Sequence, residues 1–245
     1  MKTIKIMLTT FIVAILSSNM LVAQENKGTL LNMTEFTIKP GHNAQFREGV
    51  KKWKECYMEN EGENNWNMWR RDQGEGTVYV MTGSMPNWAE MDKEDEKGKA
   101  CYLTALNFII PHIEKADNSV AQRMPNISRT FPDDAKYVRV TFYNVSNGNT
   151  FEEVINDVSK AIKDKEGTPR GMWYDSQLGG PSTADYFVSM PFKKYADLDI
   201  SKDSPRKVYT NAVGQEKSDE MVAKWYSTVK DSWSYTYTLE SELSN

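Results

Sequence analysis

In one β-rich segment of the chain, Arg139 and Tyr143 alternate with the apolar residues Val138, Val140 and Phe142. The apolar set is expected to face helices, which leaves Arg139 and Tyr143 to face an interior cavity. An arginine in a desolvated cavity binds a carboxylate or sulfate, or stabilises an enolate. Tyr143 would serve as a general acid or base if Arg139 lowered its pKa. The alternatives are a solvated Arg139 at the rim and a Tyr143 that only forms a hydrogen bond in the core.

The sequence contains two histidines, and each has a structural and a chemical interpretation. His42 follows Gly41 where a predicted strand leads into a helix, so it is a candidate general base at the mouth of a cavity. More often a histidine at such a position is simply a solvated residue of a loop or of the start of a helix. His112 lies at the end of a predicted helix, where an imidazolium interacts favourably with the helix dipole, and no chemistry is expected of it.

These residues belong to a pattern that occurs twice along the chain, which indicates a duplication. Each copy has a β-rich run ending near a glycine, an apolar helical stripe, a Met-Trp pair, a second β-rich run, a Met-Pro pair and an aromatic-Ala-acidic segment. The landmarks of the copies are Gly41 and Gly148, then Met68-Trp69 and Met172-Trp173. The predicted boundary lies in the proline-containing stretch 125–134, which divides the chain into halves 24–128 and 129–245.

The periodicities inside each half predict the order β-α-β-β-α-β, the ferredoxin-like arrangement. Apolar residues at helical spacing predict four helices, two in each half, and their stripes begin at Phe46, Tyr102, Phe151 and Val222. The predicted strands are 30–38, 66–71, 77–83 and 119–127 in the first half, and 137–145, 171–177, 185–190 and 233–240 in the second.

Each predicted sheet has a face that its helices leave uncovered, and that face carries aromatic residues. Two such faces would bury one another, so the fold class is α+β, with two tandem ferredoxin-like repeats packed as an intramolecular α/β barrel. Aligning the halves on their glycines makes three residues the counterparts of Arg139, Thr141 and Tyr143: Asn32, Thr34 and Phe36.

The second strands supply the remaining candidates for binding a substrate. Trp69 and Arg71 align with Trp173 and Asp175 on one face, which gives the mixture of aromatic and polar groups typical of small-molecule sites. The two tryptophans could instead fill the core. Arg71 and Asp175 could instead form a salt bridge between the halves.

The two cysteines, Cys56 and Cys101, fall near the end of the first helix and near the start of the second. These helices run antiparallel in the predicted fold, so their ends meet and a disulfide between the two cysteines is expected. The alternative is a pair of buried thiols. With only two Cys and two His, a zinc site built from these residues would need all four, and no metal site is predicted.

The beginning of the chain has the features of a secretory signal peptide. Lys2 and Lys5 precede an apolar run from Ile6 to Ser17, and Ala23 offers a cleavage site. The alternative is an uncleaved N-terminal anchor. Cleavage would leave 222 residues with 28 basic and 34 acidic side chains, a net charge of −6. A periplasmic or secreted protein without a stable membrane anchor is expected, and the acidic balance argues against binding nucleic acid.

The Lys39-Pro40-Gly41 opening between strand and helix and the paired aromatic-Ala-acidic segments resemble the dimeric α/β-barrel superfamily. That superfamily includes antibiotic-biosynthesis-type monooxygenases and NIPSNAP-like proteins. The resemblance implies a cavity used for oxygenation without a cofactor, isomerisation, cyclisation or dehydration. Haem-degrading members pair a Trp with an axial His on the second helix. Trp88 could be that Trp, but residues 97–110 contain no His, so haem degradation is not expected, while haem or another flat ligand stays open. No cofactor is predicted.

Two functions follow from these predictions. The first is an exported, cofactor-independent enzyme, a lyase or dehydratase, an isomerase or a monooxygenase, acting on a small organic molecule or saccharide. Its catalytic residues would be Arg139, Tyr143 and His42. The second is a protein that binds a small molecule or oligosaccharide in the same cavity without catalysis.

Overall fold

The computed structural model describes residues 28–245, and in both halves its strands and helices follow the order β-α-β-β-α-β, with the second helical segment of each half divided into two helices. The first half contributes β1 (Leu30–Ile38), β2 (Asn67–Arg71), β3 (Thr77–Met85) and β4 (Ile113–Arg123). The second half contributes β5 (Tyr137–Val145), β6 (Met172–Leu178), β7 (Tyr186–Phe192) and β8 (Val229–Leu239). The signal peptide expected at 1–23 lies outside the described residues.

The strands form one closed antiparallel barrel in the order β1-β3-β2-β8-β5-β7-β6-β4. The halves join at two seams, where β2 pairs with β8 and β4 pairs with β6. Closure pairs the edge strands of each half, so the edges that an isolated four-stranded sheet would expose are removed. The predicted fold class, an intramolecular α+β barrel, is confirmed.

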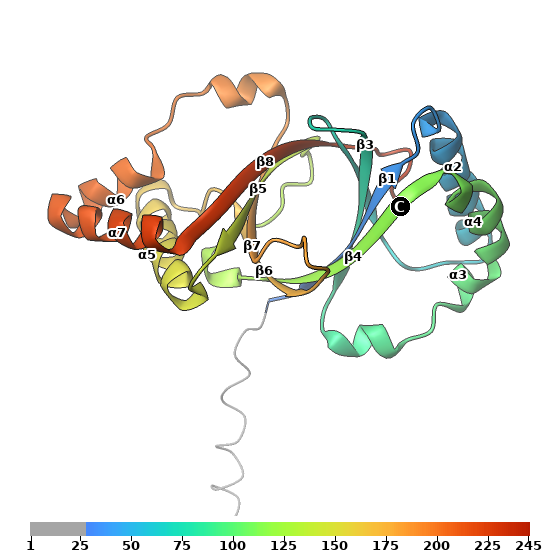
Figure 1. The fold of residues 1–245 in the computed structure, drawn as a ribbon, viewed down its shortest axis with the longest axis horizontal. Helices are drawn as coiled ribbons and strands as arrows, with labels where there is room; N and C mark the ends of the chain where they lie inside the picture. Colours follow the sequence, from blue (N-terminus) through green and yellow to red (C-terminus); the bar gives the residue numbers. More distant parts are fainter. Residues whose placement is uncertain (1–27) are drawn as a thin grey trace, which may run out of the picture.

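Helices cover the outside of the barrel in two groups at opposite ends of the molecule (Figure 1). The first half carries α2 (Asn43–Glu59), α3 (Glu96–Ala100) and α4 (Tyr102–Phe108). The second half carries α5 (Gly148–Glu166), α6 (Pro205–Val213) and α7 (Gln215–Thr228). Short 3-10 turns complete the connections: η2 (Trp88–Asp92), η3 (Ile110–His112), η4 (Pro125–Ile127) and η5 (Tyr195–Asp199). None of the helices within 28–245 has the length and apolarity needed to cross a membrane.

Local sequence accounts for where the long helices begin and end. Asn147 caps α5 by accepting a hydrogen bond from the Thr150 amide, and Gly167 ends the helix with φ +81°, a conformation that suits glycine. The stripe predicted for the first helix is buried at Phe46, Val50 and Tyr57.

Two expectations about the elements of the first half were wrong. The strand β4 begins at Ile113 rather than Ser119, since its first part continues the barrel beside β1. The stripe Tyr102, Leu106, Ile109 and Ile110 is mostly exposed, and of its four residues only Ile109 packs against the helix–sheet core that contains Phe46 and Tyr79.

The expected disulfide is present between Cys56, near the end of α2, and Cys101, the residue that joins α3 to α4. The cysteine Cα atoms lie 6.0 Å apart, within the usual range for a disulfide. The bridge fastens the short helices α3 and α4 to the long helix α2.

The C-terminal residues of the chain cross back onto the first half. Leu243 is fully buried in the helix–sheet core that contains Phe46 and Tyr79. The indole Nε1 of Trp66 donates a 2.8 Å hydrogen bond to the Leu243 carbonyl, and Glu240 forms ion pairs with Arg47 and Arg70 on the first half. This tail and the two barrel seams hold the halves together.

Candidate functional site

The barrel encloses a cavity of about 580 Å³, within the size range of small-molecule sites. Most of its wall is made by the inward-facing residues of the strands, and much of that wall is aromatic. The large aromatic side chains that line it from the strands are Trp69, Phe142, Tyr174, Phe187, Trp233, Tyr235 and Tyr237, and Phe131 lines it from a connecting segment.

The alternation along β5 is the reverse of the predicted one. Val138, Val140 and Phe142 line the cavity, while Arg139 is exposed on the outer surface. In a closed barrel the interior and the helix-covered surface are both apolar, so an apolar set of alternating residues fits either face. In this barrel the apolar residues of β5 face the interior, so Arg139 faces outward and does not reach the cavity.

Tyr143 also lies on the outer face of β5, beneath the helices. Its ring packs against Phe151 of α5, Trp225 of α7 and Trp173 of β6, at centroid distances of 5.4 to 5.7 Å. Burial raises the pKa of Tyr143 to about 12, against the opposing effect of Arg139. The expected lowering of its pKa is therefore wrong, and the side chain belongs to the core.

The equivalent residues on β1, Asn32, Thr34 and Phe36, also face outward instead of into the cavity. Asn32 is exposed on the outer face, and Phe36 packs against the helix residue Phe46 at a centroid distance of 5.8 Å. Thr34 donates a 2.8 Å hydrogen bond to Asn118 of β4. The residues that do line the cavity from this strand are Leu31, Met33 and Glu35.

The second strands show why Trp69 and Trp173 do not share a face. In the first half, Trp69 of β2 pairs with Val80 of β3, and Val80 pairs with Glu35 of β1. In the second half, Tyr174 of β6 pairs with Phe187 of β7, and Phe187 pairs with Phe142 of β5. The position equivalent to Trp69 is therefore Tyr174, one residue beyond Trp173. An offset of one residue moves a side chain to the other face of a strand. Trp173 and Asp175 accordingly point outward, and Asp175 borders a separate, smaller surface pocket.

His42 lies outside the cavity as well. Its Nδ1 atom is 2.9 Å from Nδ1 of His112, and the backbone of neighbouring Lys39 donates to the His112 carbonyl. The two histidines thus join the loop after β1 to the turn before β4. The structure brings none of Arg139, Tyr143 and His42 to the cavity.

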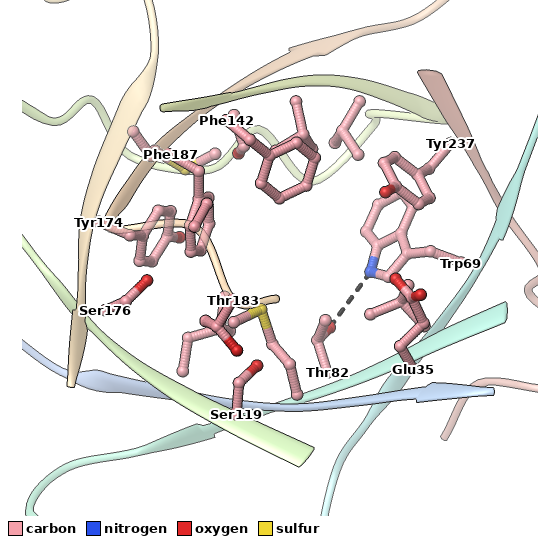
Figure 2. Close-up of a pocket in the computed structure, with 18 of the residues that line it drawn as sticks. Glu35, Trp69, Thr82, Ser119, Phe142, Tyr174, Ser176, Thr183, Phe187 and Tyr237 are labelled. Carbon is pink, nitrogen blue, oxygen red and sulfur yellow. Dashed lines mark hydrogen bonds between the residues drawn. The ribbon is translucent and has the colours of Figure 1, made fainter. Parts of the chain in front are cut away.

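Trp69 and Arg71 face the cavity as predicted. The Trp69 indole donates a 3.1 Å hydrogen bond to Thr82 Oγ1, drawn in Figure 2. The Arg71 guanidinium lies over the ring of Tyr235, 4.7 Å from its centroid, and its Nη2 donates to the Glu75 carbonyl. The Nε of Arg71 is buried and has no hydrogen-bond partner among the described residues. A buried donor without a partner is costly, so this nitrogen is suited to an acceptor atom of a ligand.

Glu35 is the functional candidate that the sequence interpretation missed. It lies on the inward face of β1, and burial raises the pKa of its carboxyl. Asp117 also raises that pKa, whereas Arg71 and Lys115 lower it. A signal was present in the sequence, because Glu35 continues the alternation of Leu31 and Met33, a face otherwise apolar.

Tyr237 completes this group on the side of the cavity where Glu35 and Trp69 lie (Figure 2). Its pKa is raised, mainly by burial and then by the charge of Glu35, while Arg71 opposes the shift. The hydroxyl therefore stays protonated at neutral pH and is available as a donor. No hydrogen bond within residues 28–245 engages the Tyr237 hydroxyl or the Glu35 carboxylate, so both are open to a ligand.

The charged side chains of the described cavity lining all come from the first half of the chain. In the first half, Glu35 pairs across the strands with Asp117. The equivalent pair in the second half is Phe142 with Trp233, two aromatic residues. Tyr174 and Phe187 lie across the cavity from Glu35 in Figure 2. A ligand with an apolar body and one polar end would bind in a single orientation.

The cavity lacks the pair of residues that the haem-degrading members use. Its described lining includes no His to serve as the axial ligand. Trp88, the residue that could match the Trp of that pattern, is exposed on η2 outside the cavity. The residues present therefore do not fit the haem-degrading arrangement. Residues 28–245 also contain no cluster of three or more side chains able to hold a metal ion.

No family model and no curated protein matches this sequence. Solved structures do match it. One is a candidate monooxygenase from Lactobacillus acidophilus, 12% identical, covering 87% of this chain and 94% of its own, with a TM-score of 0.52. A second is a candidate monooxygenase from Fusobacterium nucleatum, 11% identical, covering 87% and 93%, with a TM-score of 0.50.

A third match is an anthrone oxidase-like protein, 11% identical, covering 89% of this chain and 93% of its own, with a TM-score of 0.50. The three matches share with this chain an α+β fold built on a closed antiparallel barrel. At these identities the likeness establishes the fold of the barrel and not its chemistry.

Proposed function

We propose that this protein is an exported enzyme that removes a proton from a small organic substrate bound in the barrel, without a cofactor. The observation that carries the proposal is the buried, unpartnered Nε of Arg71 on the cavity wall that also holds Glu35. Glu35 takes the role of general base, and Arg71 the role of anion stabiliser that the sequence had suggested for Arg139.

The chemistry follows from the charges around the cavity. Glu35, ionised, accepts a proton from the carbon next to a substrate carbonyl, and the electron pair of that C–H bond moves onto the carbonyl oxygen. The resulting oxyanion accepts a hydrogen bond from Arg71 Nε, and the protonated Tyr237 hydroxyl is a second donor. A raised pKa makes Glu35 a stronger base than an exposed carboxylate. The enolate so formed is the common starting point of isomerisation, elimination and oxygenation by molecular oxygen.

Membership of the monooxygenase-like superfamily and an origin by tandem duplication are parts of this proposal. The shared element order of the halves and the equivalent cross-strand positions support duplication. The disulfide supports export, because such bonds persist in oxidising compartments. The basic and apolar N-terminal pattern supports it independently.

A second candidate function is binding without catalysis, favoured by the extent of aromatic wall in the cavity. One experiment separates the two. Aromatic ketones, keto acids and acidic sugars are incubated with the protein in D₂O, and loss of the α-proton signal is followed by NMR. Enzyme-dependent exchange supports proton abstraction; saturable binding without exchange of any ligand supports a binding protein.

Single substitutions, measured in the same exchange assay, test the roles of Glu35 and Arg71. Glu35→Gln should slow exchange by about 10²–10⁴-fold, the usual contribution of a general base. Arg71→Met should slow it by a similar factor. Arg139→Gln is the matched control, since Arg139 is exposed on the outer face. Exchange at the wild-type rate in Glu35→Gln would remove Glu35 from the mechanism.

A further inference from the structure

Residues 128–136, here called the strap, connect the two halves between η4 and β5, and part of the strap forms cavity wall. Thr130 and Phe131 line the cavity, yet 36% of the Phe131 surface is exposed to solvent. A side chain that contacts both the cavity and the solvent lies at the cavity's mouth. Phe131 therefore stands between the interior and bulk water.

Both ends of the strap are firmly held. The Arg129 amide donates to the Gly171 carbonyl at 3.0 Å, and Arg123 Nη2 donates to the Arg129 carbonyl at 2.7 Å. At the other end, Ala135 is buried and the Lys136 amide donates to the Phe192 carbonyl at 3.2 Å. These contacts attach the strap to Gly171 and Phe192 of the second half and to Arg123 of the first half, and they fix where its middle can lie.

The middle of the strap is held much less. No backbone hydrogen bond from any described residue engages the amide or carbonyl of Thr130 or Phe131. The ring of Phe131 contacts the first half through the indole of Trp69, edge to face, at a centroid distance of 6.1 Å. Displacing Phe131 would thus cost one aromatic contact and no backbone hydrogen bond.

We propose that Phe131 determines access to the cavity and selects its ligands by size, closing the mouth by packing on Trp69. The inference rests on the proposed function only in taking the cavity as the ligand site. A ligand enters when Phe131 swings away from Trp69, and it is retained when the ring returns. A ligand short enough to leave Trp69 free permits closure; a longer one holds the mouth open and dissociates faster.

The test uses 1-anilinonaphthalene-8-sulfonate, whose naphthalene suits the aromatic wall and whose sulfonate suits Arg71. Binding is followed by stopped-flow fluorescence. Phe131→Ala should raise both the association and the dissociation rate about tenfold, the size of one aromatic pair, so that Kd changes less than either rate. Phe131→Trp should slow both rates. Tyr226→Ala is the control, because Tyr226 is a large aromatic residue, 78% exposed, that does not line the cavity.

Rates in Phe131→Ala within twofold of wild type would overturn the proposal, as would an equal change in Tyr226→Ala. Failure of the probe to bind either the wild type or Phe131→Ala would also overturn it. Weaker binding in Arg71→Met confirms that the probe occupies the cavity; unchanged binding there counts against the proposal. Circular dichroism checks that each variant is folded. The proton-exchange assay is separate, so gating without exchange would leave Phe131 in its role and reject the proposed enzyme.

Discussion

The Nδ1 atoms of His42 and His112, which are 70 residues apart in the chain, lie 2.9 Å from each other with ring centroids 5.2 Å apart. The centroid separation is close to the sum of the nitrogen separation and the two short centroid-to-nitrogen distances, so the rings meet head-on. That geometry suits one Nδ1–H donating to the other Nδ1. The chain's two histidines therefore form a hydrogen bond that connects two loops of the first half, and they do not lie in the cavity.

The hydrogen bond between His42 and His112 predicts an energetic coupling between these two residues. In a double-mutant cycle with His42→Ala and His112→Ala, the coupling energy should be about 1 kcal/mol, the net contribution of one hydrogen bond. The measurement is urea unfolding of the four proteins at one fixed pH. Additive effects of the two substitutions would contradict the pairing.

The disulfide predicts a large loss of stability on reduction. A bridge with a sequence separation of 45 contributes about 4 kcal/mol on the chain-entropy model, less any strain. Cys56→Ser with Cys101→Ser should lower the free energy of unfolding by a similar amount, measured by urea titration. Adding reductant should destabilise the wild type and leave the double variant unchanged, which provides the control.

The C-terminal tail predicts that a single buried leucine stabilises the association of the halves. Leu243→Ala should cost about 2–5 kcal/mol, because the side chain is completely buried. Leu103→Ala, at a position 66% exposed on α4, should change stability by no more than about 0.5 kcal/mol. Equal effects of the two substitutions in thermal unfolding would show that the tail does not hold the first half.

Glu35 predicts a pH dependence of stability opposite to that of an ion-paired carboxylate. Its pKa in the folded protein is raised above the ordinary value of 4.5, mainly by burial, so between these two pKa values the folded state holds a proton that the unfolded state has released. Stability therefore falls as pH rises from 4.5 through the folded pKa, and the loss is complete above it. Glu35→Gln should stabilise the protein at pH 7.5, and the gain should vanish toward pH 4.

Glu166 is the matched control for that experiment. Its pKa is lowered from 4.5, first by the hydrogen bond from Arg170, so its contribution is present above pH 4.5 and is lost as pH falls through the folded pKa. Glu166→Gln should destabilise at pH 7.5. Thermal unfolding between pH 4 and 8 measures both variants, and the same sign for both would refute the assignment of Glu35.

Much of the fold could be read from the chain alone. The predicted ranges 30–38 and 137–145 coincide with β1 and β5, because alternating apolar residues between turn signals specify a strand locally. The positions of Cys56 and Cys101 predicted their bond, since the order of elements brings those helix ends together. The expectation of a barrel followed from sheets with two apolar faces.

The site was less accessible to sequence reasoning. A period of two separates the faces of a strand without saying which face turns inward, and closure of the barrel makes both faces apolar. The alternation along residues 138–143 therefore separates Arg139 and Tyr143 from the apolar set but does not show which set faces the interior. Trp173 was misplaced because the Met-Trp pairs of the two halves are offset by one residue in the barrel.

The sequence by itself determined the strands, the long helices, the barrel and the disulfide, since each depends on local periodicity or on the order of elements along the chain. Only the tertiary structure decided which residues meet inside. Glu35, Arg71 and Tyr237 come from three different strands, and the desolvation that raises the pKa of Glu35 exists only after the barrel has closed around it. Burial of a charge is a property of the assembled walls, and no spacing in the chain records it.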